Sequence, residues 1–460
     1  MSASCTAVAG LVLAIAATST CAAPQATAPS TPGVEWSSPI ELARGGGERG
    51  PWQQNDSRYD YVDDPTVALR GDGATIVAWV DHRAKDLFVQ TYRADGRPER
   101  APINVSRSPA TFSWLPRLAI SPRDPEHLFL VWQEIVFTGG SHGGDIYFAR
   151  SRDGGATWSP PLDLSRASLH GDGKARITKS IWHNGSLDLA VAEHAIYAAW
   201  TDYEGTLHVA SSDDDGASFS APRALAGDAS RPARAPALAI GPHALYLAWT
   251  LGEDDRADIH VMRSDDAGRT WTAPTIVERT PHYSDAPKLA VDRNGTLHVV
   301  YAESTGGPFD RFTIRYTRSR DEGRTFAPAR ALSGVGGHFP ALAIDERDHL
   351  FVLWEVFVAG AEQPRGLAFA ESFDDGATFT APSAIANSSD PQGGWNGSHQ
   401  GRLMNKLAVR AGRIAVVNSS LEPGDHSRVW LIRGRMTTHP TTIAPVSPLA
   451  DVLQARQDRD

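Results

Sequence analysis

The sequence predicts an all-β fold, a β-propeller with seven four-stranded sheets, or blades, around one axis; six blades are the alternative. Three observations predict it. An apolar strand with a Leu-Ala or Val-Ala core recurs seven times, at a spacing of about 50 residues. A second strand follows each copy and ends in an aromatic residue in six of the seven copies. In five copies a third strand then leads into an eight-residue turn. Four short strands per unit at this period are typical of propeller blades.

The first two strands of each unit are defined by their apolar cores and their closing residues. The seven first strands centre on Pro65–Leu69, Pro116–Ile120, Leu187–Val191, Pro236–Ile240, Pro287–Val291, Pro340–Ile344 and Asn405–Val409. The second strands end at Trp79, Trp132, Trp200, Trp249, Tyr301 and Trp354, and Asn418 takes that place in the last copy.

The recurrent turn reads S-x-D-x-G-x-[ST]-[WF]. Its five copies are Ser151–Trp158, Ser212–Phe219, Ser264–Trp271, Ser319–Phe326 and Ser372–Phe379. The Asp carboxylate can accept backbone N–H groups within its own hairpin, and the Gly supplies a left-handed position. The closing aromatic residue is expected to anchor the turn against the sheet. We therefore predict a structural role for these aspartates.

This turn is the Asp box, and through it the chain resembles the sialidase superfamily of BNR-repeat propellers over nearly the whole predicted propeller. The resemblance implies that the Asp boxes lie on the face opposite the active site. It also implies a site built from three arginines that grip a substrate carboxylate, a Tyr nucleophile activated by a Glu, and an Asp general acid.

The two ends of the chain are expected to close the ring. The seventh copy has three strands but neither an Asp box nor a fourth strand, and the segment Val34–Ala43 (VEWSSPIELA) resembles the missing strand. Pairing it with the last blade would leave no open sheet edge. The predicted organisation is a signal peptide over residues 1–23, an Ala/Pro/Thr linker over 24–33, the propeller over 34–438 and a tail over 439–460.

Composition limits the partners and the compartment. The formal net charge of −10 without a basic cluster argues against nucleic-acid binding. Both cysteines, Cys5 and Cys21, lie in the N-terminal segment, so no disulfide or cysteine metal site is expected in the propeller. We predict a secreted or periplasmic monomer without a transmembrane segment, with a lipid anchor at Cys21 as the alternative. No cofactor and no metal site are predicted.

The start of each first strand and the end of each second strand are predicted to meet on one rim of the ring. Two residues before the proline position, the copies read Asp63, Trp114, Gly185, Arg234, Asp285, His338 and Leu403. Two residues after the aromatic position, they read Asp81, Glu134, Asp202, Leu251, Glu303, Val356 and Ser420. Polar, acidic and aromatic groups that converge on one mouth suggest a ligand site. The alternative is a set of solvated loops.

The resemblance assigns roles to some of these positions. Tyr283 and Glu303 are placed like the family's Tyr nucleophile and its Glu base, with Asp81 or Asp86 as the general acid. The family's Arg-x-Pro recurs in this register only at Arg234, which would contact the substrate carboxylate. The first blade departs from the pattern because it reads Asp63-Asp64-Pro65 where the family has an arginine. Further carboxylate-binding candidates without a specific motif are Arg117 and Arg402, together with Arg83, Arg231 and Arg311.

Two long insertions fall on the same predicted rim, at His170–Ser186 and Asp390–Met404. Each holds a Trp, Trp182 and Trp395, that could stack on a sugar ring. The alternative is that each loop packs on its own Trp. Together these features favour a secreted, glycan-active protein, an exo-acting glycoside hydrolase of sialidase type that takes a glycan or glycoconjugate. The alternative is a non-catalytic propeller that serves as a binding platform for protein or polysaccharide.

Overall fold

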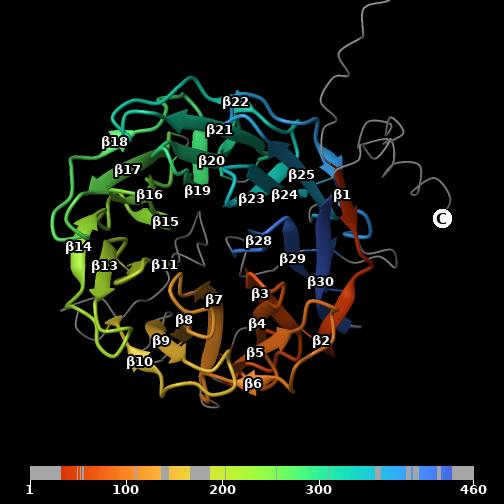
Figure 1. The fold of residues 1–460 in the computed structure, drawn as a ribbon. Helices are drawn as coiled ribbons and strands as arrows, with labels where there is room; N and C mark the ends of the chain where they lie inside the picture. The colour runs from red at the N-terminus through yellow and green to blue at the C-terminus, as the bar shows by residue number, and fades with distance from the viewer. Residues whose placement is uncertain are drawn as a thin grey trace, which may run out of the picture.

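Seven antiparallel sheets stand around a common axis (Figure 1), which confirms the seven-bladed propeller over the six-bladed alternative. The computed structural model describes residues 33–48, 50–51, 53, 56–108, 111–135, 144–165, 187–202, 204–254, 256–308, 310–357, 364–389, 395–396, 404–421 and 426–437. Within these segments no helix has the length and apolar character to cross a membrane.

Each blade runs from an inner strand at the axis to an outer strand at the circumference. Blade 1 has β3 (Val62–Leu69), β4 (Thr75–Asp81), β5 (Asp86–Tyr92) and β6 (Ile103–Asn104), and blade 2 has β7 (Phe112–Ile120), β8 (Leu128–Ile135), β9 (Gly144–Ser151) and β10 (Leu162–Asp163). Blade 3 has β11 (Leu187–Val191), β12 (Ile196–Thr201), β13 (Leu207–Ser212) and β14 (Arg223–Ala226). Blade 4 has β15 (Ala233–Ile240), β16 (Leu245–Leu251), β17 (Asp258–Ser264) and β18 (Thr275–Ile276). Blade 5 has β19 (Tyr283–Val291), β20 (Leu297–Ser304), β21 (Thr313–Ser319) and β22 (Arg330–Ala331), and blade 6 has β23 (Gly337–Ile344), β24 (Leu350–Val356), β25 (Leu367–Ser372) and β26 (Ser383–Ala384).

Blade 7 closes the ring with strands from both ends of the chain. Its inner strands β28 (Leu407–Arg410) and β29 (Arg413–Leu421) precede β30 (His426–Thr437), and the short β27 (Trp395–Asn396) pairs with the far end of β29. The N-terminal strands β1 (Gly33–Trp36) and β2 (Ile40–Gly46) both pair antiparallel with β30. The predicted closure by the N-terminal strand is therefore confirmed, and the outer edge of β30 is covered.

The core lies between blades, which explains why the second strands read as continuous apolar runs rather than as alternating ones. Separate apolar clusters fill the spaces between successive blades, including the one between blades 7 and 1. The recurrent aromatic residue of the second strand is part of this layer, because Trp132, Trp200 and Trp249 are at most 1% exposed. The apolar repeat in the sequence is thus the repeat of the inter-blade core.

The Asp boxes fold as the sequence predicts. In the copy of blade 5, the Asp321 carboxylate accepts the Thr325 N–H at 2.9 Å, the Thr325 hydroxyl at 2.6 Å and the Ser319 hydroxyl at 2.7 Å. Glu322 and Gly323 have φ values of 64° and 81°, so the turn uses two successive left-handed residues. These hydrogen bonds lower the pKa of Asp321 to about 2 and keep it ionised.

Candidate functional site

A bulge at the start of five inner strands builds the mouth of the propeller. The residue before the proline has a positive φ and the strand register shifts there. These left-handed residues are Asp64, Leu115, Ala235, Ala286 and Phe339. A bulge leaves its extra residues out of the ladder and re-aims the neighbouring side chains. The repeated bulge therefore turns the residues on both sides of it toward the space between the blades and the axis.

The residue after the proline position takes an equivalent place on the inner strand of each blade, and we call these seven residues the axial ring. Its seven members, one from each blade, are Thr66, Arg117, Asp188, Ala237, Lys288, Ala341 and Lys406. The charged members interact across blade boundaries. The Arg117 Nε lies 3.9 Å from the Asp188 Oδ1, and the Lys406 ammonium forms an ion pair with Glu355 of blade 6. All four charged members are buried.

Lys288 is a member of the axial ring whose pKa is strongly lowered. Burial and the nearby Arg117 and Lys406 charges lower its pKa to about 7, against the opposing effect of Asp188. These neighbours come from blades 2, 3 and 7, whereas Lys288 belongs to blade 5, so the groups meet at the axis. A lysine that titrates near neutrality can exchange a proton or bind an anionic group at physiological pH.

A second constellation, the Arg-Tyr-Asp cluster, lies between blades 4 and 5 and consists of Arg234, Tyr283 and Asp285. The Tyr283 hydroxyl donates to the Asp285 Oδ2 at 3.1 Å, and the Arg234 Nη2 lies 3.6 Å from the Asp285 Oδ1. The Arg234 guanidinium also stacks over the Tyr283 ring at 5.1 Å. Thr250, on the second strand of blade 4, donates to the Asp285 Oδ1 at 2.9 Å. The structure thus brings together three of the residues that the sequence singles out.

The electrostatics of the cluster favour a neutral phenol next to a carboxylate. Tyr283 is 1% exposed and packs edge-on against Phe312, and burial and the Asp285 charge raise the pKa of its hydroxyl. A carboxylate that accepts the phenol hydrogen bond is placed to take the proton when the phenol reacts. Arg234, 2% exposed, provides the positive charge that would stabilise the phenolate or bind a substrate anion.

Glu303 does not join this cluster. It lies opposite Ser284 in the ladder, so its side chain is on the other face of the sheet from Tyr283. There its Oε2 lies 3.5 Å from the Arg315 Nε, within a group that includes Glu278. Asp285, two residues after Tyr283 on the same strand, occupies the place next to the phenol that the resemblance assigns to a glutamate.

The two predicted general acids lie in turns of blade 1. The Asp81 Oδ1 accepts the N–H groups of Arg83 and Ala84, and so caps the turn between β4 and β5. The Asp86 carboxylate is buried and accepts bonds from Asn104 and Ser106. These contacts give both carboxylates a structural role, and they do not place either next to Tyr283.

The other predicted rim residues divide between the two faces of the strands. Asp63 accepts the Ser419 hydroxyl at 2.5 Å across the boundary between blades 7 and 1. Trp114 is buried beside His82, and the His338 ring stacks on Phe339 and Phe312. Arg402 and Trp182 lie outside the described residues, as does the side chain of Trp395.

The second residue after the closing aromatic residue of each second strand was expected on the rim, but it turns away from the mouth. Glu134 accepts the indole N–H of Trp132 at 3.0 Å, and Ser420 accepts that of Trp430 at 3.0 Å. The residues one position after the aromatic residue face the mouth instead, as the bonds of Thr250 and Ser419 show. The alternation of a strand explains this difference, because a shift of one position changes the face. The same reasoning could have found Glu355 and the axial ring.

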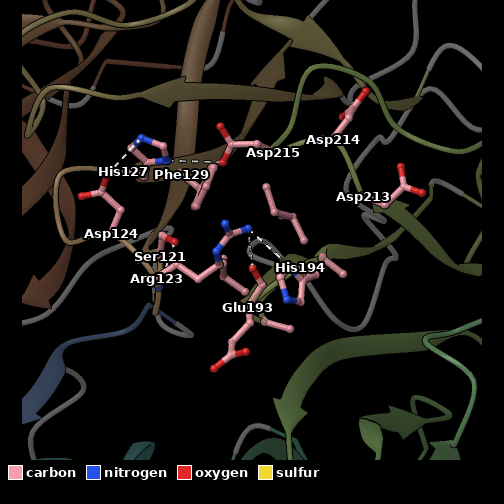
Figure 2. A pocket seen from close by; sticks show the side chains of 14 residues that line it. Ser121, Arg123, Asp124, His127, Phe129, Glu193, His194, Asp213, Asp214 and Asp215 are labelled. Atoms are coloured by element: carbon pink, nitrogen blue, oxygen red, sulfur yellow. Dashed lines mark hydrogen bonds and ion pairs between the residues drawn. The ribbon is translucent and has the colours of Figure 1, made fainter.

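Two cavities flank these features on opposite faces. A cavity of about 600 Å³ lies beside blade 1 on the side of the mouth, where Tyr59, His82 and the cations Arg58, Arg83 and Lys85 are among its lining residues. The other, of about 480 Å³, lies between blades 2 and 3 on the Asp-box face (Figure 2). Its wall combines Arg123, His127 and His194 with Asp213, Asp214 and Asp215, the last three from an Asp box.

Comparisons with known proteins agree with this architecture. A family model described as a BNR repeat-like domain matches residues 243–346. A comparison with curated protein sequences finds no match. Among solved structures, a PL25 ulvan lyase bound to -[GlcA(1-4)Rha3S]- has 12% sequence identity, a TM-score of 0.55, and coverage of 91% of this chain and 99% of that chain.

Two further solved structures are similar at comparable identity. The polysaccharide lyase Uly1 has 12% identity and a TM-score of 0.50, with 81% of this chain and 89% of that chain covered. The GH93 α-L-arabinofuranosidase of Fusarium graminearum in complex with arabinobiose has 14% identity and a TM-score of 0.46, with 70% and 93% covered. At such identities the likeness concerns the fold. Five Asp boxes, seven blades and the matching repeat model confirm the predicted resemblance to the sialidase superfamily: the chain is a seven-bladed Asp-box, or BNR-repeat, β-propeller.

Proposed function

We propose that this propeller is a glycan-active enzyme that binds an acidic glycan at its axial mouth and hydrolyses a glycosidic bond there. The observation that carries the proposal is the Arg-Tyr-Asp cluster. In it the hydroxyl of a buried tyrosine donates a hydrogen bond to a carboxylate, and a guanidinium lies over the tyrosine ring and close to that carboxylate. These are the groups that a tyrosine nucleophile needs: an acceptor for its proton and a positive charge that stabilises the phenolate.

In this proposal Tyr283 is the nucleophile, Asp285 is its base and Arg234 binds the substrate carboxylate. A neutral phenol suits an anionic sugar because it approaches without charge repulsion. The resemblance to the sialidase superfamily implies Glu303 as the base, and we assign this role to Asp285 because, of the two, Asp285 bonds to the phenol. Attack by the Tyr283 oxygen on the anomeric carbon, with its proton passing to Asp285, would form a glycosyl-tyrosine and break the glycosidic bond, and the aglycone oxygen would take a proton from water. A second water would then attack the anomeric carbon, release the sugar and return the proton to Tyr283.

Two features support an acidic substrate. Arg117, Lys288 and Lys406 bring three basic groups from three blades to the carboxylates of Asp188 and Glu355, in a chain whose formal net charge is −10. The similar ulvan lyase is bound to -[GlcA(1-4)Rha3S]-, a glycan that carries both a carboxylate and a sulfate. Charge-assisted bonds from lysine and arginine are the ordinary means of binding such groups.

The test is an assay of the full-length protein on a panel of sialosides and uronic-acid oligosaccharides. We expect wild type to release sugar, and Tyr283→Phe and Asp285→Asn to lose at least about 100-fold in kcat/KM. Tyr301→Phe is the matched control, because Tyr301 is also buried and donates to a carboxylate, Glu278, at 2.8 Å, on a different strand. It should keep activity within a few-fold of wild type.

The outcomes separate three functions. Equal activity of wild type and Tyr283→Phe would remove the proposed nucleophile. Cleavage that forms an unsaturated uronate, seen as a new ultraviolet absorbance, would show elimination instead of hydrolysis. Binding without any cleavage would favour the non-catalytic binding platform, for which the burial of Tyr283 and Arg234 and the hydrogen bond from Tyr283 to Asp285 are the supporting observations.

We further propose that the protein acts outside the cytoplasm after removal of residues 1–23. Mass spectrometry of the mature chain tests this, because cleavage near residue 23 leaves a free N-terminus. A lipid-modified Cys21 would instead establish the anchored alternative.

A further inference from the structure

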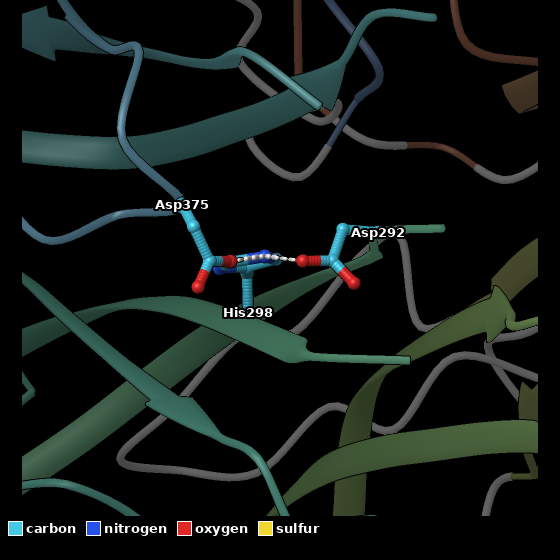
Figure 3. Close-up of side chains that lie close together, drawn as sticks. All are labelled: Asp292, His298 and Asp375. Atoms are coloured by element: carbon cyan, nitrogen blue, oxygen red, sulfur yellow. Dashed lines mark ion pairs between the residues drawn. The ribbon is translucent and has the colours of Figure 1, made fainter. Parts of the chain in front are cut away.

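Three ionisable side chains meet in the seam between blades 5 and 6, on the Asp-box face. Asp292 lies in the turn between β19 and β20, His298 lies on β20, and Asp375 is the fourth residue of the blade 6 Asp box. Figure 3 shows the imidazole between the two carboxylates. The His298 Nε2 lies 3.7 Å from the Asp292 Oδ2 and 3.6 Å from the Asp375 Oδ1. We call these three residues the seam cluster.

Each member is held in place by its other polar atoms. The Asp292 Oδ1 accepts the N–H groups of Asn294 and Thr296 at 2.9 and 2.8 Å. The Asp375 Oδ2 accepts from the Arg320 Nη2 at 2.5 Å. The His298 Nδ1 lies 2.8 Å from the Tyr316 hydroxyl, which can fix the ring orientation as a second-shell partner.

The remaining atom of each group is buried and points into the cluster. The Asp292 Oδ2, His298 Nε2 and Asp375 Oδ1 have no hydrogen-bond partner within the described part of the chain. The side chains of Asp292 and His298 are 0% exposed and that of Asp375 is 29% exposed, and all three atoms lie within 4.8 Å of one another. Asp375 is already paired with Arg320 through its other oxygen, so the charge left to compensate is that of Asp292, whose ion-pair partner among the described residues is His298. A buried charge without a counter-charge is costly, and a cation between the three atoms would compensate it.

We propose that the seam cluster binds one divalent transition-metal ion, with Zn²⁺ as the best match, and that the ion clamps blade 5 to blade 6. A cation equidistant from the three atoms would lie about 2.0–2.4 Å from each of them, close to the distances of Zn–N and Zn–O bonds. A neutral imidazole with two carboxylates suits zinc, whereas calcium takes six to eight oxygen ligands. The sequence predicted no metal site, because the ligands come from two blades and form no motif.

The seam between blades 2 and 3 provides a comparison within the same molecule. There His127 lies 3.4 Å from Asp124 and 3.5 Å from Asp215, and Asp215 holds the same position of its Asp box as Asp375. The residue types are the same, but His127 meets the two aspartates through different ring nitrogens, the three side chains are 26%, 48% and 33% exposed, and they line the cavity of Figure 2. Water can solvate that group, so the proposal concerns the buried cluster alone.

The test measures zinc uptake by the full-length protein after treatment with chelator and dialysis. Equilibrium dialysis with Zn²⁺ and elemental analysis should give one tightly bound zinc per chain, and Zn²⁺ should raise the Tm of the chelator-treated protein. His298→Gln should weaken this binding at least about tenfold. The matched variant His127→Gln should leave the tight site unchanged.

Two results would overturn the proposal. The first is no tight zinc uptake by wild type, which would leave a protonated His298 as the positive charge between the carboxylates. The second is full zinc stoichiometry in both His298→Gln and Asp375→Asn. If these variants do not fold, the chelator-treated wild type decides, because a Co²⁺ complex with its visible absorption and a Tm rise with zinc would support the site, and the lack of both would exclude it.

Discussion

At the scale of single residues, the axial mouth depends on charges that the fold has removed from water. Lys288 shows the effect best, since its neighbours Arg117 and Lys406 add repulsion to the loss of hydration and lower its pKa to about 7. Such a group destabilises the fold when it is protonated, and natural proteins keep such groups where function requires them. The axial ring therefore has the properties of a site.

This shift predicts how stability depends on pH. Below pH 7 both the folded and the unfolded chain hold the Lys288 proton, and the cost of burying the charge is complete. Between pH 7 and about 10.5 the unfolded chain binds more protons, so the free energy of unfolding should rise with pH by at most about 1.4 kcal/mol per unit from this group. Urea unfolding of wild type and Lys288→Met at pH 7, 8 and 9 measures it. Lys288→Met should be the more stable at pH 7, and its advantage should shrink as the pH rises; parallel curves would contradict the assigned shift.

At the scale of elements, the Asp box joins blades as well as strands. Where an arginine precedes the box serine, the next blade has an acid at the fourth box position that pairs with it. The pairs are Arg150 with Asp215, Arg263 with Glu322, and Arg318 with Asp375. Where the preceding residue is Ser211, the next box has Ala267. The turn thus works as a connector between neighbouring blades.

The fifth position of the blade 6 Asp box, Gly376, should tolerate no side chain. A Cβ on Gly376, at a φ of 69°, would lie 1.7 Å from the Tyr316 hydroxyl. Gly295 also has a positive φ, 85°, yet a Cβ there would meet nothing within 4 Å. We expect Gly295→Ala to lower the free energy of unfolding by about 1 kcal/mol through backbone strain alone. Gly376→Ala should lower it by at least about 2–3 kcal/mol, because the clash with Tyr316 adds to the strain. Thermal unfolding of both variants checks this; equal losses would show that the Tyr316 contact is unimportant.

The elements were easier to predict from the sequence than the site. The apolar period and the Asp boxes indicate blades directly, because each repeat must bury the same face between its neighbours. The site depends on the register at the bulges, where Ala286 and Pro287 leave the ladder and change which side chains face the mouth. The sequence therefore indicated that Asp285 lies on the rim. It did not indicate that Asp285 bonds to Tyr283, or that Glu303 lies on the other face of the sheet from Tyr283.

At the scale of the whole molecule, ring closure makes the two ends of the chain interdependent. The N-terminal strands β1 and β2 cover β30, and Trp36 packs edge-on against Phe369 of blade 6 at 5.5 Å. The inner strand of blade 7 in turn contacts that of blade 1, where the Val67 N–H donates to the Asn405 carbonyl at 3.1 Å. We therefore expect the last blade to need both ends of the chain for its stability.

Truncation tests this dependence. Deletion of residues 1–32 keeps both N-terminal strands and should leave the Tm within about 2 °C of the full-length value. Deletion of residues 1–46 removes both strands and exposes the β30 edge, so we expect aggregation and a lower Tm. Size-exclusion chromatography and scanning calorimetry distinguish the two proteins. A monomeric, equally stable protein lacking residues 1–46 would show that closure by the N-terminal strands is dispensable.

We expect the axial mouth, not the Asp-box face, to receive an acidic glycan. The most direct measurement is a crystal structure of Tyr283→Phe soaked with an acidic oligosaccharide that the wild-type protein binds or cleaves. Sugar density should lie at the mouth, with the carboxylate within bonding distance of Arg234 or Lys288. Density in the cavity beside Arg123 and His127 instead, with the mouth unchanged, would contradict it.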